Sequence, residues 1–117
     1  MHYQLSIKEN AIDSFNEALA KFDQGQNGDV KAYKFAILHT SHFLELVLKI
    51  YIISIDENLV FSKCFREVTK VAKENSIDLL AAHQKIKGEG KELDVYIKNI
   101  ANPHTITLDQ ALEFCKN

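Results

Sequence analysis

One apolar segment, residues 33–55, constrains the fold of this chain more than any other feature. It reads YKFAILHTSHFLELVLKIYIISI, and its central charged residues, Glu45 and Lys49, are four positions apart, about one helical turn. A soluble domain shields so apolar a helix by surrounding it with other helices. We therefore predict a helix over about residues 30–55 at the centre of an all-α bundle of four or five helices.

Length and composition favour a single domain over residues 1–117. Hydrophobic residues make up 46% of the chain and charged residues 26%, as in ordinary globular proteins, so a core can form without disulfides or metals. Only four glycines and one proline are present, too few for a fold with many β-turns.

The first helix is predicted from apolar residues at spacings of three, four and three, namely Ile12, Phe15, Leu19 and Phe22. Ser6 and Glu9 have the spacing of a capping box, so we place this helix at about 7–22. It is expected to be amphipathic.

Later helices are predicted from similar patterns. They lie at about 62–75 and 77–87, and a further helix is favoured over 93–100. Asn75 and Ser76 mark the end of the first of these and a new cap. Thr107 and Gln110 form a second capping box, which opens the last helix at residue 108.

The sequence favours a cytoplasmic protein. Cys64 and Cys115 lack Cys-x-x-Cys spacing and are typical of buried cysteines in a reducing compartment. The first ten residues do not have the pattern of a secretion signal. The longest uncharged apolar run of the central segment covers ten residues, 35–44, whereas a membrane span needs about 20. We predict no membrane span.

Charge is distributed unevenly around a formal net charge of −2, which gives no signal for DNA binding. Residues 1–30 carry a net charge of −3, and residues 62–91 a net charge of +3. The second segment is where RNA would bind, although such a patch is also typical of a solvated surface. Its candidate RNA contacts are Lys63, Arg66, Lys70, Lys73, Lys85 and Lys87.

The central segment also resembles a known family. The run Ala36-Ile37-Leu38-His39, followed by Glu45-Leu46-Val47-Leu48-Lys49, is similar to the second helix of bacterial HEPN-type proteins. Leu59–Phe61 and Ile106–Cys115 follow in the order found in an uncharacterised bacterial branch of that group. The resemblance implies an α-helical bundle that pairs as a dimer. It also implies a place among toxin–antitoxin or phage-defence proteins, many of which are metal-independent ribonucleases.

The catalytic signature of those ribonucleases is an arginine followed four to six residues later by a histidine. Such a pair supplies a base for the 2′-hydroxyl and a cation for the charge on the phosphorane. Arg66 is the only arginine here, and the next histidine, His83, is seventeen residues further on. We therefore expect either a short non-catalytic form or a piece that ends before its catalytic helix.

Glu45 and Lys49 have two interpretations. They form an ordinary ion pair between adjacent helical turns, or Glu45 lies in a polar pocket and orients a catalytic group or a basic residue of a partner. His39, His42 and Glu45 lie at successive spacings of three, and metal sites in helical bundles use similar spacings. No second ligand motif appears elsewhere, so we predict no metal and no cofactor.

Two weaker candidates for chemistry remain. His83 is a general base only if the helices that carry it and Arg66 meet. Cys115 is a nucleophile only beside a base, and no neighbouring residue indicates one.

The sequence thus predicts a non-catalytic HEPN-like bundle that forms a homodimer or binds a partner protein. The alternative is an RNA-binding protein, or a component or fragment of a metal-independent ribonuclease.

Overall fold

The structure is a computed structural model that describes the backbone of residues 2–116 and the side chains of residues 6–116. These residues form five α-helices and two short 3-10 helices, and their one β-pairing is an isolated bridge between Phe61 and Thr105. The predicted all-α class and the predicted long helix at about 30–55 are confirmed. In chain order the elements are α1 His2–Gln26, α2 Ala32–Ile55, η1 Glu57–Val60, α3 Ser62–Asn75, α4 Leu79–Gly88, η2 Leu93–Tyr96 and α5 Leu108–Cys115.

The chain divides into two compact units, Met1–Ile50 and Tyr51–Asn117. The first contains α1 and most of α2, and the second contains the end of α2 and every later element. One domain over residues 1–117 stays a prediction.

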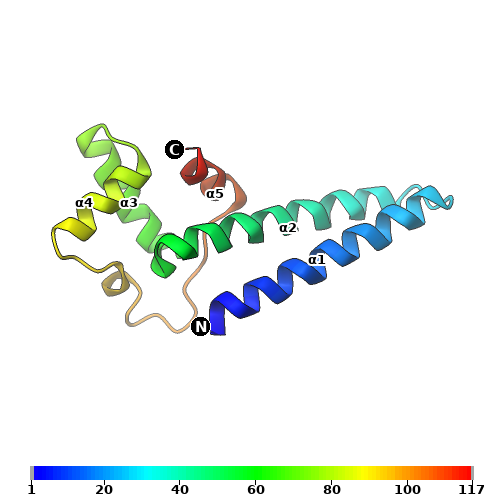
Figure 1. Ribbon diagram of the computed structural model, residues 1–117, viewed down its shortest axis with the longest axis horizontal. Coiled ribbons are helices and arrows are strands. Elements are labelled where there is room, and N and C mark those ends of the chain that lie inside the picture. Colours follow the sequence, from blue (N-terminus) through cyan, green and yellow to red (C-terminus); the bar gives the residue numbers. More distant parts are fainter. Residues whose placement is uncertain (1, 117) are drawn as a thin grey trace. The chain divides into compact units, whose positions relative to one another are not determined.

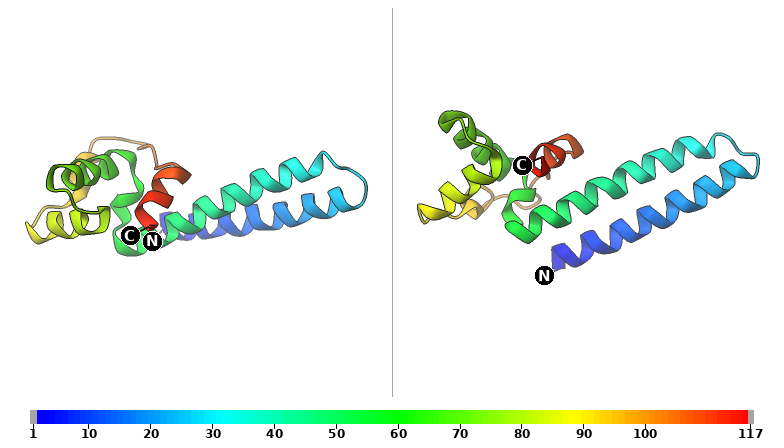
Figure 2. Two further views of the ribbon diagram at one scale, coloured as in Figure 1. Left: turned by 90° about the horizontal axis from the view of Figure 1, so that it is seen from above. Right: turned by 45° about the horizontal axis from the view of Figure 1, so that its top comes forward.

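The first unit is an antiparallel helical hairpin in which α1 and α2 run side by side (Figures 1 and 2). Residues 27–31 form the turn, in which Gly28 has a positive φ of 112° and the Ala32 N–H donates to the Asp29 carbonyl at 2.9 Å. Phe15 of α1 contacts Phe43 of α2 with ring centroids 5.0 Å apart, and Phe22 contacts Tyr33 at 5.7 Å.

The predicted start of the first helix is wrong. The helix already begins at His2, so Ser6 lies inside it with an exposed side chain and does not cap it. No glycine or proline precedes Ser6 to stop the helix, so the helical backbone continues through Ser6. The helix also extends to Gln26 rather than ending near residue 22.

The long helix α2 is less covered than its sequence suggests. Leu46, Ile52 and Ile53 are buried, whereas Leu44 and Val47 remain exposed on other sides of the helix. By length and composition α2 could cross a membrane, with a mean hydropathy of 1.4 over its most apolar window. That is weak evidence, since the core helix of a soluble protein has the same features. The absence of a membrane span stays a prediction.

The core of the second unit is built by α3 and α4, with the 3-10 helices and α5 supplying further side chains. Phe65 of α3 lies against Phe114 of α5 with ring centroids 6.5 Å apart. Cys64, Phe65, Val68 and Ala72 of α3 are buried, and Val71 is half-buried. The fully buried side chains include Leu59, Val60, Cys64, Val68, Ala82, Leu93 and Ala111.

The ends of these helices match the predictions in part. Thr107 and Gln110 form the predicted capping box at the start of α5. Ser76 ends α3 in the left-handed conformation, with φ of 53°, but the cap of α4 is Asp78, whose side chain accepts from the Ala81 N–H at 2.7 Å. Residues 93–100 form one turn of 3-10 helix, at Leu93–Tyr96, and not the favoured longer helix.

Candidate functional site

Small residues form the side of α1 that packs against α2. Ala11, Ser14 and Ala18 are buried on one side of the helix at spacings of three and four, and Gly25 continues this line seven residues after Ala18. A Cβ atom on Gly25 would lie 2.7 Å from the Tyr33 ring, so the absence of a side chain there lets the ring rest on α1. The hairpin therefore closes through small side chains.

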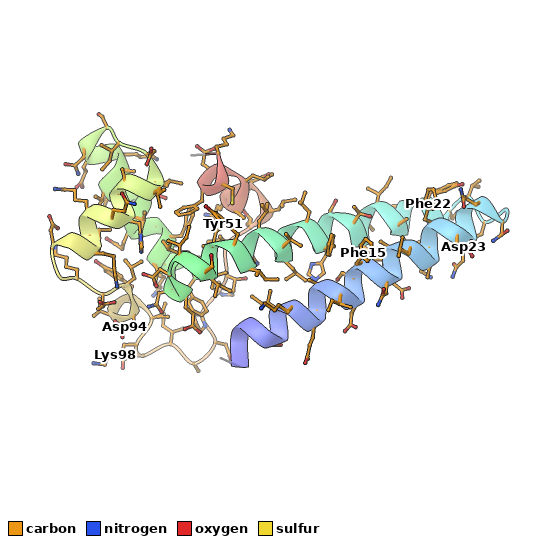
Figure 3. All side chains as sticks on the ribbon, in the orientation of Figure 1. Phe15, Phe22, Asp23, Tyr51, Asp94 and Lys98 are labelled. Atoms are coloured by element: carbon orange, nitrogen blue, oxygen red, sulfur yellow. The ribbon has the colours of Figure 1, made fainter. Side chains whose placement is uncertain are left out.

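This packing leaves the large side chains of α1 on the surface. Ile12, Phe15, Leu19 and Phe22, which the sequence marks as the apolar stripe, are all exposed. Ile12, Phe15 and Leu19 each lie one position after a buried seam residue, and so about 100° around the helix from the seam. Figure 3 labels Phe15 and Phe22 on the hairpin.

Exposed side chains of α2 continue the same surface. Ile37, Leu44 and Val47 recur at spacings of seven and three, and Ile37 borders the same groove as Phe15 and Leu19. We call this surface the apolar face, made of Ile12, Phe15, Leu19, Phe22, Ile37, Leu44 and Val47.

A groove of about 620 Å³ runs along the apolar face between the two helices. Its floor consists of the buried residues Ala18 and Ala36, with Thr40 and Ser41 beside them, and its walls are aromatic and aliphatic. No charged side chain lines the groove. A ligand or partner would therefore be held by shape and apolar contact.

Glu45 and Lys49 form an ion pair in α2, with Lys49 Nζ 3.1 Å from Glu45 Oε2. The Lys49 side chain is only 6% exposed and that of Glu45 26% exposed. The geometry is that of the ordinary pair between successive turns, but the burial of Lys49 makes the loss of its partner costly. A role of Glu45 toward a catalytic group stays a prediction.

The histidines beside this pair do not assemble a metal site. His39 is half-buried and His42 is exposed. Across the described part of the chain, no three histidine, cysteine or acidic side chains are arranged to hold a metal ion.

The six basic candidates for RNA contact fall into two groups. Lys63, Arg66, Lys70 and Lys73 recur at spacings of three, four and three on an exposed side of α3. Lys85 and Lys87 instead pair with Glu89 at 3.5 Å and Glu92 at 2.7 Å. The hydrogen bond that Lys87 donates to Glu92 also raises the pKa of Lys87. The four residues of α3 therefore form one exposed basic surface.

His83 is engaged by Asp56 and not by Arg66. Its Nε2 lies 3.0 Å from Asp56 Oδ2, and the two side chains are 7% and 10% exposed. Asp56 Oδ1 accepts from the Asn58 N–H, while His83 Nδ1 is buried without a partner among the described atoms. Arg66 lies on the exposed side of α3. The two residues are 27 positions apart, so no local spacing in the sequence indicated this pair.

Neither cysteine has the surroundings of a nucleophile. Burial, with help from Asp56 and Asp94, raises the pKa of Cys64 to about 11, and its Sγ donates to the Leu93 carbonyl at 3.2 Å. Burial also raises the pKa of Cys115. Both thiols are free. A reducing compartment stays a prediction.

Comparison with known proteins adds no family. No family model, no curated protein and no solved structure matches this chain. The HEPN resemblance stays a prediction.

Proposed function

We propose that this chain is a homodimerising helical module whose hairpins pair through the apolar face. Two α1–α2 hairpins, one from each copy, would pack as a four-helix bundle. The observation that carries the proposal is the row of large apolar side chains left exposed on both helices of the hairpin. A layer of two helices covers one side of each helix and leaves such side chains in water.

A second copy suits this surface because the apolar face is complementary to itself. Phe15, Leu19 and Ile37 project from it, while the groove beside them has a floor of small residues. A two-fold interface places the same patch on both subunits, so that projecting residues of one copy fill the groove of the other. The lining of the groove is uncharged, so the contact between two grooves would bring no like charges together.

The size of the apolar face also suits a dimer. Phe15 and Phe22 are each nearly half exposed, so together they leave roughly 200 Å² of ring surface in water. The five aliphatic residues extend this to several hundred Å², more than scattered apolar residues on a monomer surface. A standard interface buries about 800 Å² on each partner.

A membrane fits the hairpin less well than a second copy. Asp13 and Glu17 lie on the exposed flank of α1 away from the apolar face, and Glu17 pairs with Lys21 at 3.7 Å. Hydrocarbon around the hairpin would surround these charges, at a cost of about 3 kcal/mol for each acid near the bilayer centre. A second copy covers the apolar face alone.

The proposal is tested by placing a charge within the apolar face. Ile37→Glu should weaken self-association at least ~100-fold, because each interface would bury two unpaired carboxylates. The matched control is Val95→Glu, since Val95 is 61% exposed and Ile37 67%, and Val95 lies in η2 of the other unit. The measurement is size-exclusion chromatography with light scattering, with circular dichroism to verify helix content.

Two results would contradict the proposal. One is a wild-type protein that is monomeric at its highest soluble concentration. The other is an Ile37→Glu variant that dimerises as well as Val95→Glu. Sedimentation of wild-type protein with lipid vesicles, lost in Ile37→Glu, would assign the apolar face to a membrane instead.

Membership of a toxin–antitoxin or phage-defence system, and cleavage of RNA, remain predictions of the resemblance. Incubation of the purified protein with cellular RNA in excess chelator tests cleavage. A non-catalytic module leaves the RNA intact.

A further inference from the structure

A second cavity, of about 490 Å³, lies in the other unit at the start of α3. Its polar lining is basic or neutral, consisting of Ser62, Lys63, Arg66 and His104, and its remaining walls are Ile100 and Pro103. No acidic side chain lines it. From this lining we propose that the cavity binds the phosphate group of a nucleotide-sized organic phosphate.

The backbone holds this cavity in place. The Ser62 N–H donates to the His104 carbonyl at 2.8 Å, and the Ile106 N–H donates to the Val60 carbonyl at 2.9 Å. The bridge between Phe61 and Thr105 lies between these two bonds. The segment that carries His104 is thereby fixed against the first turn of α3, so little ordering is needed when a ligand binds.

The charges in this cavity are available to a ligand. Lys85, Lys87, Lys91 and Lys116 each have a carboxylate within 4.0 Å, whereas no ion pair of this kind is found for Lys63 or Arg66 among the described residues. A guanidinium holds two phosphate oxygens at once, and an ammonium adds a third contact. The N-terminal end of α3 contributes further positive potential at the same place.

The volume and the apolar walls indicate more than a bare phosphate ion. Cavities that hold small organic ligands measure about 300–1,000 Å³, and this one lies within that range. Ile100 and Pro103 offer apolar surface beside the cations, which suits the sugar or base next to a phosphate. Lys70 and Lys73 continue the basic side of α3 beyond the cavity, so the nucleotide can be free or part of an RNA strand.

The inference does not depend on dimerisation, and it is tested on the whole chain by calorimetric titration with adenosine 5′-monophosphate. Arg66→Gln should weaken binding about 10-fold or more, because it removes the charged fork that holds the phosphate. The control Lys85→Gln removes an equal charge from an exposed lysine outside the cavity, and should change the affinity less than about 2-fold.

Two further ligands complete the test. Inorganic phosphate should bind more weakly than the nucleotide, because it does not reach the apolar walls. If the natural ligand is part of an RNA strand, a short RNA should bind the wild-type protein and lose affinity in Arg66→Gln. If the natural ligand is a free nucleotide, the short RNA should not compete with adenosine 5′-monophosphate for the cavity.

Three results would overturn the assignment. They are no binding of the nucleotide, equal binding by Arg66→Gln and Lys85→Gln, and binding of RNA with no binding of the nucleotide. The last would make the basic side of α3, without the cavity, the RNA-binding surface.

Discussion

At the scale of single residues, the contact of Asp56 with His83 joins two polar side chains of different elements that are only 10% and 7% exposed. The two residues are 27 positions apart, so no local spacing in the sequence indicates their contact. The turn after α2 places Asp56, and the packing of α4 against α3 places His83. Such a pair follows from tertiary structure, which explains why sequence patterns missed it.

Removing the histidine should destabilise the second unit. His83→Ala leaves the Asp56 carboxylate buried without its partner, and we expect the free energy of unfolding to fall by about 3 kcal/mol. Urea denaturation followed by circular dichroism measures it. The control Lys85→Ala breaks an exposed pair and should change the free energy by less than about 1 kcal/mol. Equal effects of the two substitutions would show that the buried pair contributes no more to the free energy of unfolding than the exposed pair does.

Cys64 gives a prediction about pH. An ordinary thiol ionises near pH 9.0, and burial raises the pKa of Cys64 to about 11. Between these values the unfolded chain releases a proton that the folded chain keeps, so the free energy of unfolding falls as the pH rises. Cys64→Ala lacks this contribution. Its urea midpoint should therefore decline less than that of wild type between about pH 8 and pH 10.5; parallel declines would contradict this prediction.

At the scale of elements, α1 shows why an apolar pattern locates a helix but not its packing. The spacing of Phe15, Leu19 and Phe22 correctly indicates a helix, yet the buried side is the neighbouring line of small residues. Ala11, Ala18 and Gly25 recur every seven residues, and this period was the available signal for the helix seam. Apolar residues outnumber the positions that one hairpin can bury, so spacing alone does not select among them.

Local sequence patterns were also insufficient to predict where the helices begin. The capping boxes at Thr107 and Ser6 look alike in sequence, and only the first is formed. Asn102 and Pro103 interrupt the chain shortly before Thr107, whereas no breaker precedes Ser6. A capping pattern therefore predicts a helix start when the preceding residues leave the helix.

Gly25 tests the close approach of the two helices. Gly25→Ala should destabilise the hairpin by about 1 kcal/mol, although alanine is the better helix former, because the new Cβ displaces Tyr33 and weakens its contact with Phe22. Gly88→Ala is the control, since it has open space around it and should be neutral or stabilising by up to about 1 kcal/mol. Thermal unfolding of both variants decides; a stabilised Gly25→Ala would exclude close packing at this point.

At the scale of the whole molecule, composition and the apolar segment sufficed to predict the all-α class and the long helix. They did not predict the division after Ile50, because α2 continues through it without a break in its apolar pattern. The six basic residues were treated as one group on net charge alone. Ion pairs with Glu89 and Glu92 separate two of them from the basic side of α3, and such pairs depend on the arrangement of residues 85–92 in space.

Dimerisation through the apolar face is the central claim, and sedimentation equilibrium of the wild-type protein over a range of dilutions tests it most directly. The mass should be twice 13.3 kDa and should change little with salt, since an uncharged groove is not screened. Dilution should eventually yield the monomer. A mass of 13.3 kDa at every concentration would contradict the claim and leave the apolar face without the partner proposed for it.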